Sequence, residues 1–97
     1  MDGLNEVIHQ PVRLRIMSIL ATISPERQAT FAFLKAACDV TDGNLGAHLR
    51  KLEEAGYITI TKAFVQQKPQ TYVEITVAGK EAFEEHRAAL ERILNNG

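Results

Sequence analysis

The sequence contains few residues of the kinds that carry specialised chemistry. Among its 97 residues there is one cysteine, Cys38, and no tryptophan. A single cysteine allows neither an intramolecular disulfide nor a thiolate zinc cluster. Aromatic residues make up only 6% of the chain, which argues against the stacking platforms that bind single-stranded nucleic acids. The composition therefore excludes a disulfide scaffold and disfavours a single-strand binder.

Long apolar runs and a secretory leader are also lacking. No run approaches the roughly 20 apolar residues that a membrane-spanning helix needs. The first residues, Met1 to Glu6, do not show the basic and then apolar order of a signal peptide. We therefore expect a cytoplasmic protein without a membrane partner.

The chain has almost no excess charge of either sign. Eleven Lys and Arg residues face twelve Asp and Glu residues, so the formal net charge is −1. A protein that coats nucleic acid without selectivity would carry a strong positive charge. A content of 45% hydrophobic and 24% charged residues is typical of a globular chain. The length predicts one domain over residues 1–97.

The parts of a catalytic or metal site are missing from the sequence. There is no Gly-rich phosphate-binding loop with its lysine, and there is no nucleophile elbow. The histidines, His9, His48 and His86, have no obvious carboxylate or cysteine partner in the sequence. His9 and His86 can meet only through folding or dimerisation. We therefore expect no enzyme, no bound metal and no cofactor, and no ligand pocket for an effector is visible.

Apolar periodicity and capping residues predict three helices in the first part of the chain. Apolar side chains recur at helical spacing over residues 11–22, and a Ser-Pro pair then stops the helix. A brief extended piece over residues 28–30 leads to Thr30, which can cap a short helix. A third helix begins after the N-cap Thr41 and ends at Gly56, which supplies the left-handed conformation found after many helices.

The rest of the chain alternates first with a period of two and then with a helical period. Residues 57–64 and 71–75 read as two strands, and residues 65–69 read as a polar loop between them. An amphipathic helix is expected from the N-cap Thr76 to the end. The predicted order is helix, short strand, helix, helix, hairpin, helix, which is an α+β fold.

Two helices separated by three or four residues and followed at once by a hairpin are the elements of a winged helix-turn-helix. Four motifs occur in order at matching spacing: His9 to Ile16, Phe31 to Lys35, Thr41 to Leu45 with His48-Leu49 and Leu52 to Tyr57, and Thr71 to Gly79. In these the sequence resembles the short winged helix-turn-helix regulators related to the MarR and ArsR groups. The resemblance covers nearly all of the chain. It implies a three-helix core with a β-hairpin wing, an additional C-terminal dimerisation helix, and double-stranded DNA as the partner.

Helical spacing separates the buried and exposed sides of residues 41–56. At 100° per residue, Leu49 and Leu52 lie within about 40° of Leu45, so the three form one core stripe. The opposite surface carries small residues that permit close approach to a groove of DNA. Asn44 could pair with adenine or reach a phosphate from the start of the helix.

The remaining predicted contacts are mainly cations and amides. Arg50 and Lys51 suit phosphate binding, and Lys62, Gln67 and Lys68 place polar groups on the wing. The family wing usually has arginine here, so the departure predicts weak wing binding. The predicted DNA-binding residues are Thr41, Gly43, Asn44, Ala47, His48, Arg50, Lys51, Lys62, Gln67 and Lys68.

Some of these residues also have a simpler interpretation. The mixed charges of residues 50–54 are compatible with a solvated helix face. His48 fits a histidine at the edge of the core as well as it fits a phosphate contact. Cys38 fits a small buried residue better than a redox sensor, because nothing near it in the sequence would stabilise a thiolate.

Both ends of the chain carry more apolar surface than the three helices and the hairpin need. One module with few phosphate contacts binds weakly, so we expect a homodimer that reads a pseudo-palindromic operator, with the N-terminal segment 1–10 and the helix 77–97 in its interface. Alternatively, both ends cap their own domain. The competing function is a protein–protein interaction module without DNA binding. The predicted interface residues are Leu4, Val7, Ile8, Phe83, Leu90, Ile93 and Leu94.

The charges are unevenly distributed along the chain. Four cations and two acids lie within residues 44–72, so this stretch is +2 and the remainder is −3. Many of the acids lie in the C-terminal helix, which is expected to point away from DNA. The near-zero total therefore predicts a DNA-binding protein with few phosphate contacts per subunit.

Overall fold

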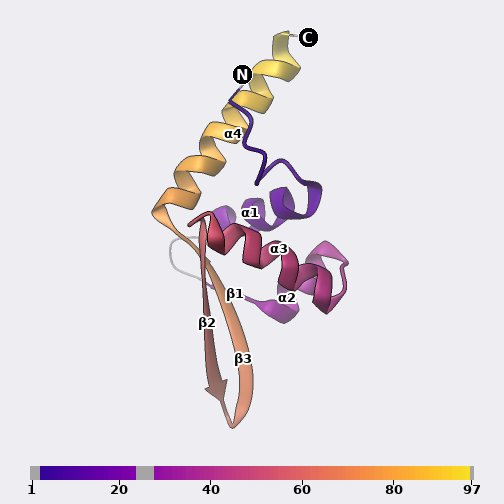
Figure 1. Ribbon diagram of the computed structural model, residues 1–97, viewed down its shortest axis with the longest axis vertical. Coiled ribbons are helices and arrows are strands. Elements are labelled where there is room, and N and C mark those ends of the chain that lie inside the picture. The colour runs from indigo at the N-terminus through magenta and orange to yellow at the C-terminus, as the bar shows by residue number, and fades with distance from the viewer. Residues whose placement is uncertain (1–2, 24–27, 97) are drawn as a thin grey trace.

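The computed structural model describes residues 3–23 and 28–96. The order of elements matches the sequence prediction: three helices with a short strand before the second, then a hairpin and a long terminal helix (Figure 1). This confirms the predicted α+β winged-helix fold. The elements are α1 (Pro11–Ile23), β1 (Ala29–Thr30), α2 (Phe31–Cys38), α3 (Asp42–Glu54), β2 (Ile58–Val65), β3 (Lys68–Ile75) and α4 (Val77–Asn96).

Three threonines cap the helices that they precede, as the sequence predicts. The hydroxyl oxygens of Thr30, Thr41 and Thr76 accept hydrogen bonds from the backbone N–H three residues further on, at 3.0, 3.1 and 2.9 Å respectively. Each bond satisfies one of the N–H groups that the first turn of a helix leaves without a partner. Gly56, with a φ of 82°, follows α3 in the left-handed region. Local chemistry thus defines the ends of α3.

The three strands form one antiparallel sheet in the order β1-β3-β2. β2 and β3 pair along their whole length, from Ile58 opposite Ile75 to Val65 opposite Lys68. The short β1 pairs only with Tyr72 and Val73 of β3. The outer part of the hairpin therefore has no third strand, and it projects away from the helices in Figure 1.

The predicted polar loop over residues 65–69 is wrong, because the strands continue to a two-residue turn. Gln66 and Gln67 have φ values of 52° and 66°, as a tight type I′ turn requires. Pro69 lies inside β3, opposite Phe64. In an antiparallel ladder this pair, next to the one that closes the turn, is not hydrogen-bonded, so the missing N–H of Pro69 would have pointed away from β2.

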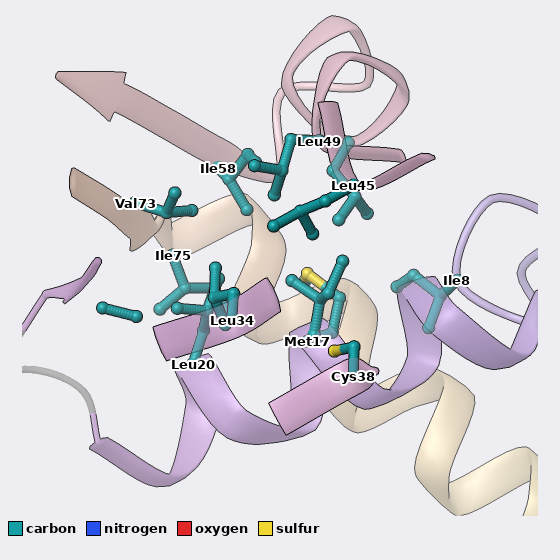
Figure 2. Packing of buried hydrophobic residues seen from close by; sticks show 13 residues of the cluster. Ile8, Met17, Leu20, Leu34, Cys38, Leu45, Leu49, Ile58, Val73 and Ile75 are labelled. Carbon is teal, nitrogen blue, oxygen red and sulfur yellow. The ribbon is translucent and has the colours of Figure 1, made fainter. Parts of the chain in front are cut away.

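The hydrophobic core lies where α1, α2 and α3 meet the inner half of the hairpin (Figure 2). Cys38 is part of it, which confirms its prediction as a small buried residue. Burial raises the pKa of the Cys38 thiol, so the neutral form is favoured. Other buried members are Ile8, Ile16, Met17, Leu20, Leu34, Leu45, Leu49, Leu52, Ile58, Val73 and Ile75.

The molecule is elongated, with extents of 52 × 26 × 21 Å. The tip of the hairpin and the C-terminal end of α4 lie at opposite ends of the long axis, with the three-helix core between them (Figure 1). α1 contacts α4, and α4 has buried residues as far as Ala89, whereas its last residues, 91–96, are exposed. None of the helices in the described residues is long and apolar enough to cross a membrane.

Candidate nucleic-acid interface

α3 is divided into a buried stripe and a broad exposed surface. Leu45, Leu49 and Leu52 are buried in the core. The residues at the start of the helix that are predicted to contact DNA are all exposed. The two residues of its second half that are predicted to bind phosphates are exposed as well. Because the leucine stripe fixes the rotation of the helix, the other side of α3 is available to a partner. The exposed residues are Thr41, Gly43, Asn44, Ala47, Arg50 and Lys51.

The start of α3 has a threonine cap and an ion pair with the preceding helix. Lys35 of α2 forms an ion pair of 2.9 Å with Asp42, the first residue of α3. Both side chains are largely exposed, so the pair contributes little to stability. Asp42 also complements the positive end of the helix dipole. With the Thr41 cap, these contacts orient the amino-terminal turn that carries Asn44.

A groove of about 700 Å³ separates the exposed side of α3 from the wing. Phe31, Leu49 and Ile60 supply its apolar lining. Arg50 of α3 and Lys62 of β2 both line the groove. The structure therefore brings together two cations that lie on different elements and are twelve residues apart in the sequence, with the acidic Glu53 in the same lining.

His48 differs from the other predicted contacts because it is half-buried and already has a partner. Its Nδ1 lies 3.1 Å from Nη1 of Arg13, a permanent donor, so Nδ1 accepts this hydrogen bond. The Nε group of Arg13 also donates to the Val7 carbonyl. Burial, and then the charge of Arg13, lower the pKa of His48. The structure therefore supports the interpretation of His48 as a histidine at the edge of the core.

His9 and His86, which could meet only through folding or dimerisation, are brought together by folding. Nδ1 of His9 lies 3.3 Å from Nε2 of His86. His86 is fully buried, and its Nδ1 accepts the backbone N–H of Asn5 at 2.9 Å. The side-chain amide of Asn5 in turn donates to the hydroxyl of Tyr57 at 2.8 Å. The N-terminal segment thus connects α4 to the residue that leads from α3 into the wing.

The predicted dimer residues lie in very different environments. Ile8 is fully buried in the core of its own chain, so its prediction as an interface residue is wrong: the turn before α1 directs it inward. Val7 and Phe83 are partly buried against the core. Ile93 and Leu94 are 42% and 76% exposed on the last turns of α4. Leu4 and Leu90 are half-buried.

The helix pair, the capped and exposed α3, and the projecting hairpin together define the class of winged-helix proteins. The chain belongs to the winged helix DNA-binding domain family, whose sequence model matches residues 12–94. This confirms the resemblance that the four sequence motifs indicate. The fold and the family are those of transcriptional regulators.

Relatives share part of the sequence, and solved structures share the fold. An uncharacterized protein of Methanocaldococcus jannaschii is 32% identical over 91 residues, which are 94% of this chain and 96% of the relative. A transcriptional regulator homologue from Pyrococcus horikoshii is 34% identical, with a TM-score of 0.84 over 95% of this chain and 88% of the other. A MarR family regulator from Silicibacter pomeroyi shares the fold at 20% identity, with a TM-score of 0.59 over 95% of this chain and 58% of that one.

Proposed function

We propose that this protein is a sequence-specific double-stranded DNA-binding transcriptional regulator that acts as a homodimer on a pseudo-palindromic operator. The observation that carries the proposal is the juxtaposition of the exposed side of α3 with the groove that Arg50 and Lys62 line. A recognition helix in the major groove needs a small, polar leading surface and flanking cations that bind the phosphates. The family and the regulator homologue support this function.

The residues of α3 divide into base contacts and phosphate contacts. Gly43 and Ala47 are small, so the helix can approach the base edges closely, and Asn44 can form two hydrogen bonds with an adenine. Thr41 lies at the start of the helix, where backbone N–H groups favour phosphate. Lys51 suits the phosphates on one flank of α3. His48 makes a phosphate contact only through the ring edge that does not face Arg13.

The wing completes the interface from the other side of the groove. Arg50 and Lys62 line this groove together, so one DNA strand can run between α3 and the wing with a phosphate near both cations. Gln67 and Lys68 lie at the tip and reach a more distant part of the backbone. With few cations per subunit, tight binding at physiological salt requires two subunits on one operator.

The first test measures the salt dependence of DNA binding. Fluorescence anisotropy with an operator selected from genomic fragments should give a steep negative slope of log affinity against log salt. Arg50→Gln and Lys62→Gln should each lower the magnitude of this slope by about 0.9 per lost phosphate contact in each subunit. Arg87→Gln is the matched control, because it removes the same charge from α4, where Arg87 pairs with Glu84 and Glu91.

Three outcomes of this experiment decide the proposal. If the control variant lowers the slope as much as Arg50→Gln, the effect reflects net charge and the proposed surface is wrong. Equal affinity for selected and random duplexes would contradict sequence-specific recognition. No salt-dependent binding to any duplex would favour the protein–protein interaction module instead.

The second test concerns the dimer. Ile93 and Leu94 are exposed apolar side chains on the free end of α4, and an exposed patch of this kind is typical of a contact surface. We propose that the dimer interface combines them with Leu4, Val7, Phe83 and Leu90. Size-exclusion chromatography with light scattering at tens of micromolar should give a dimer for the wild type and a monomer for Leu94→Glu.

The dimer variant also separates assembly from folding. Because Leu94 is 76% exposed, Leu94→Glu should keep the far-UV circular dichroism spectrum and lose most of the operator affinity. Val77→Glu, at the other end of α4, is a matched control, because Val77 is an apolar side chain that is 73% exposed and the substitution adds the same single negative charge. A monomeric wild type at these concentrations would refute the proposed dimer.

A further inference from the structure

We propose that Phe64, backed by Pro69, is an apolar wedge at the tip of the wing that enters the minor groove of bound DNA and bends the duplex by opening a base step. The proposal rests on the DNA-binding function proposed above and adds to it a residue that decides specificity through DNA shape. It starts from a side chain that the fold leaves without packing: Phe64 is 78% exposed.

The tip of the wing is built to hold Phe64 in a defined position. Phe64 lies opposite Pro69, one residue before the end of the ladder, and the hairpin closes with a two-residue turn. Pairing continues up to Val65 and Lys68, so the tip is not a loose loop. The fixed φ of proline and the paired backbone limit the backbone entropy that the tip loses when a partner buries it.

Strand alternation places Phe64 on the side of the hairpin that carries the cationic groove. Ile58 and Ile60 face the core, so Lys62 and Phe64, two and four residues after Ile60, share that face. Lys62 lines the groove with α3. At about 3.4 Å per residue, Phe64 lies roughly 7 Å further out along the strand than Lys62. Phe64 thus extends the proposed DNA-facing surface beyond its last cation on this face.

The geometry of DNA then determines what Phe64 meets. Each strand of a duplex separates a major groove from a minor groove. If α3 occupies the major groove and the strand runs between Arg50 and Lys62, the side chain beyond Lys62 faces the adjacent minor groove. That groove is about 6 Å wide, which admits the edge of one aromatic ring but not a helix.

The chemistry of the tip favours a wedge over readout by hydrogen bonds. Proteins that read the minor groove electrostatically insert arginine or lysine, whereas proteins that bend DNA insert apolar side chains between base steps, phenylalanine and proline among them. On the groove-facing side, the outermost cross-strand pair is Phe64 and Pro69. Lys68 pairs with Val65 on the other face, where it can still reach a phosphate.

This placement predicts a DNA sequence preference at a base step to which the protein makes no hydrogen bond. Opening a base step costs least at pyrimidine–purine steps such as TA and CA. The selected operators should therefore carry such a step on the outer side of each half-site, where the minor groove faces the wing. An operator with a stiff A-tract at that position should bind the protein more weakly.

The experiment compares Phe64→Ala with Val65→Ala on the selected operator. Val65 is a matched control, because it is the neighbouring residue, 45% exposed, and points to the opposite face. Bending is measured by energy transfer between dyes at the two duplex ends. Unstacking is measured by the fluorescence of 2-aminopurine placed at the predicted base step. Phe64→Ala should abolish the 2-aminopurine signal, reduce the bend and lower the affinity about tenfold. Its salt slope should stay unchanged, because no charge is lost.

The possible outcomes separate this inference from the proposed function. If the wild type and Phe64→Ala bind a specific operator with the same 2-aminopurine signal and the same bend, the wedge is refuted while the DNA-binding function stands. If Phe64→Ala changes only the oligomeric state in light scattering, the tip is a contact between protein chains and the wedge is refuted. Phe64→Leu should retain part of the bend, and equal loss in Val65→Ala would also refute the assignment.

Discussion

Replacing Gly79 with alanine is expected to lower the free energy of unfolding by about 2–4 kcal/mol, a large part of the stability of a small domain. Gly79 lies in the first turn of α4, where it is buried against the segment that follows α3. A Cβ atom at this position would overlap the carbonyl oxygen of Tyr57 and come within 2.9 Å of Cγ1 of Ile75. Because the first obstacle is backbone, it cannot move aside by changing a rotamer.

The same carbonyl also holds α4 in place, so the clash has a second cost. The backbone N–H of Thr76 donates to the oxygen of Tyr57 at 3.0 Å, and the Thr76 hydroxyl donates to the oxygen of Gly56 at 2.7 Å. Moving α4 outward to make room for a methyl group would lengthen both bonds, each worth about 1 kcal/mol. The higher helix propensity of alanine offsets only about 1 kcal/mol.

Chemical denaturation measures this effect, and Gly46→Ala is the matched control. A Cβ added at Gly46, inside α3, meets nothing within 4 Å, so this variant should gain about 0.5–1 kcal/mol. Gly79→Ala should melt about 10–30 °C below the wild type, at roughly 4–8 °C per kcal/mol for a domain of this size. Equal melting temperatures for the two variants would show that the junction between α3 and α4 tolerates a methyl group.

Acidification below about pH 6.5 is expected to destabilise the protein, with His86 as the main cause. Nδ1 of His86 accepts the N–H of Asn5, so the neutral ring carries its proton on Nε2 and donates it to His9. A second proton would have to sit on Nδ1, facing the N–H of Asn5. Burial, and then the charge of His9, lower the pKa of His86 below its usual 6.5.

The sign of the pH effect follows from linkage. Because the pKa of His86 is lower in the folded chain, the unfolded chain binds more protons as the pH falls below 6.5. The stabilisation is therefore complete above that pH and is lost as the pH falls towards the folded pKa. His48, whose pKa is also lowered, contributes in the same direction. Urea unfolding between pH 8 and pH 5 should show this decline.

Two substitutions at position 86 separate titration from packing. In His86→Asn, the amide oxygen can replace Nδ1 as the acceptor for Asn5 but does not titrate, so the pH dependence should flatten to the part that His48 supplies. His86→Ala removes the acceptor altogether and should cost about 1–3 kcal/mol at pH 7.5 for the partly buried N–H of Asn5, in addition to the cavity. An unchanged decline in His86→Asn would show that His86 is not the titrating group.

The helices were predictable because their signals are local. Thr30, Thr41 and Thr76 cap helices through bonds to the third residue along the chain, and the leucine stripe of α3 depends only on the helical repeat. The wing turn was mispredicted for an equally local reason: Pro69 and the polar pair Gln66-Gln67 read as a loop. Whether a proline fits a strand depends on which way its missing N–H would point, and only the register of the two strands decides this.

The sequence by itself determined the winged-helix fold, its family and the exposed side of α3, since these depend on periodicity, caps and motif spacing. Only the tertiary structure decided the rest. The contacts of Arg13 with His48, Asn5 with Tyr57 and His9 with His86 join residues 35, 52 and 77 positions apart. The packing of distant elements likewise decides the burial of Ile8, the groove that Arg50 and Lys62 line, and the exposure of the Phe64 side chain. No local pattern encodes these distances, because they arise only when the elements meet around a common core.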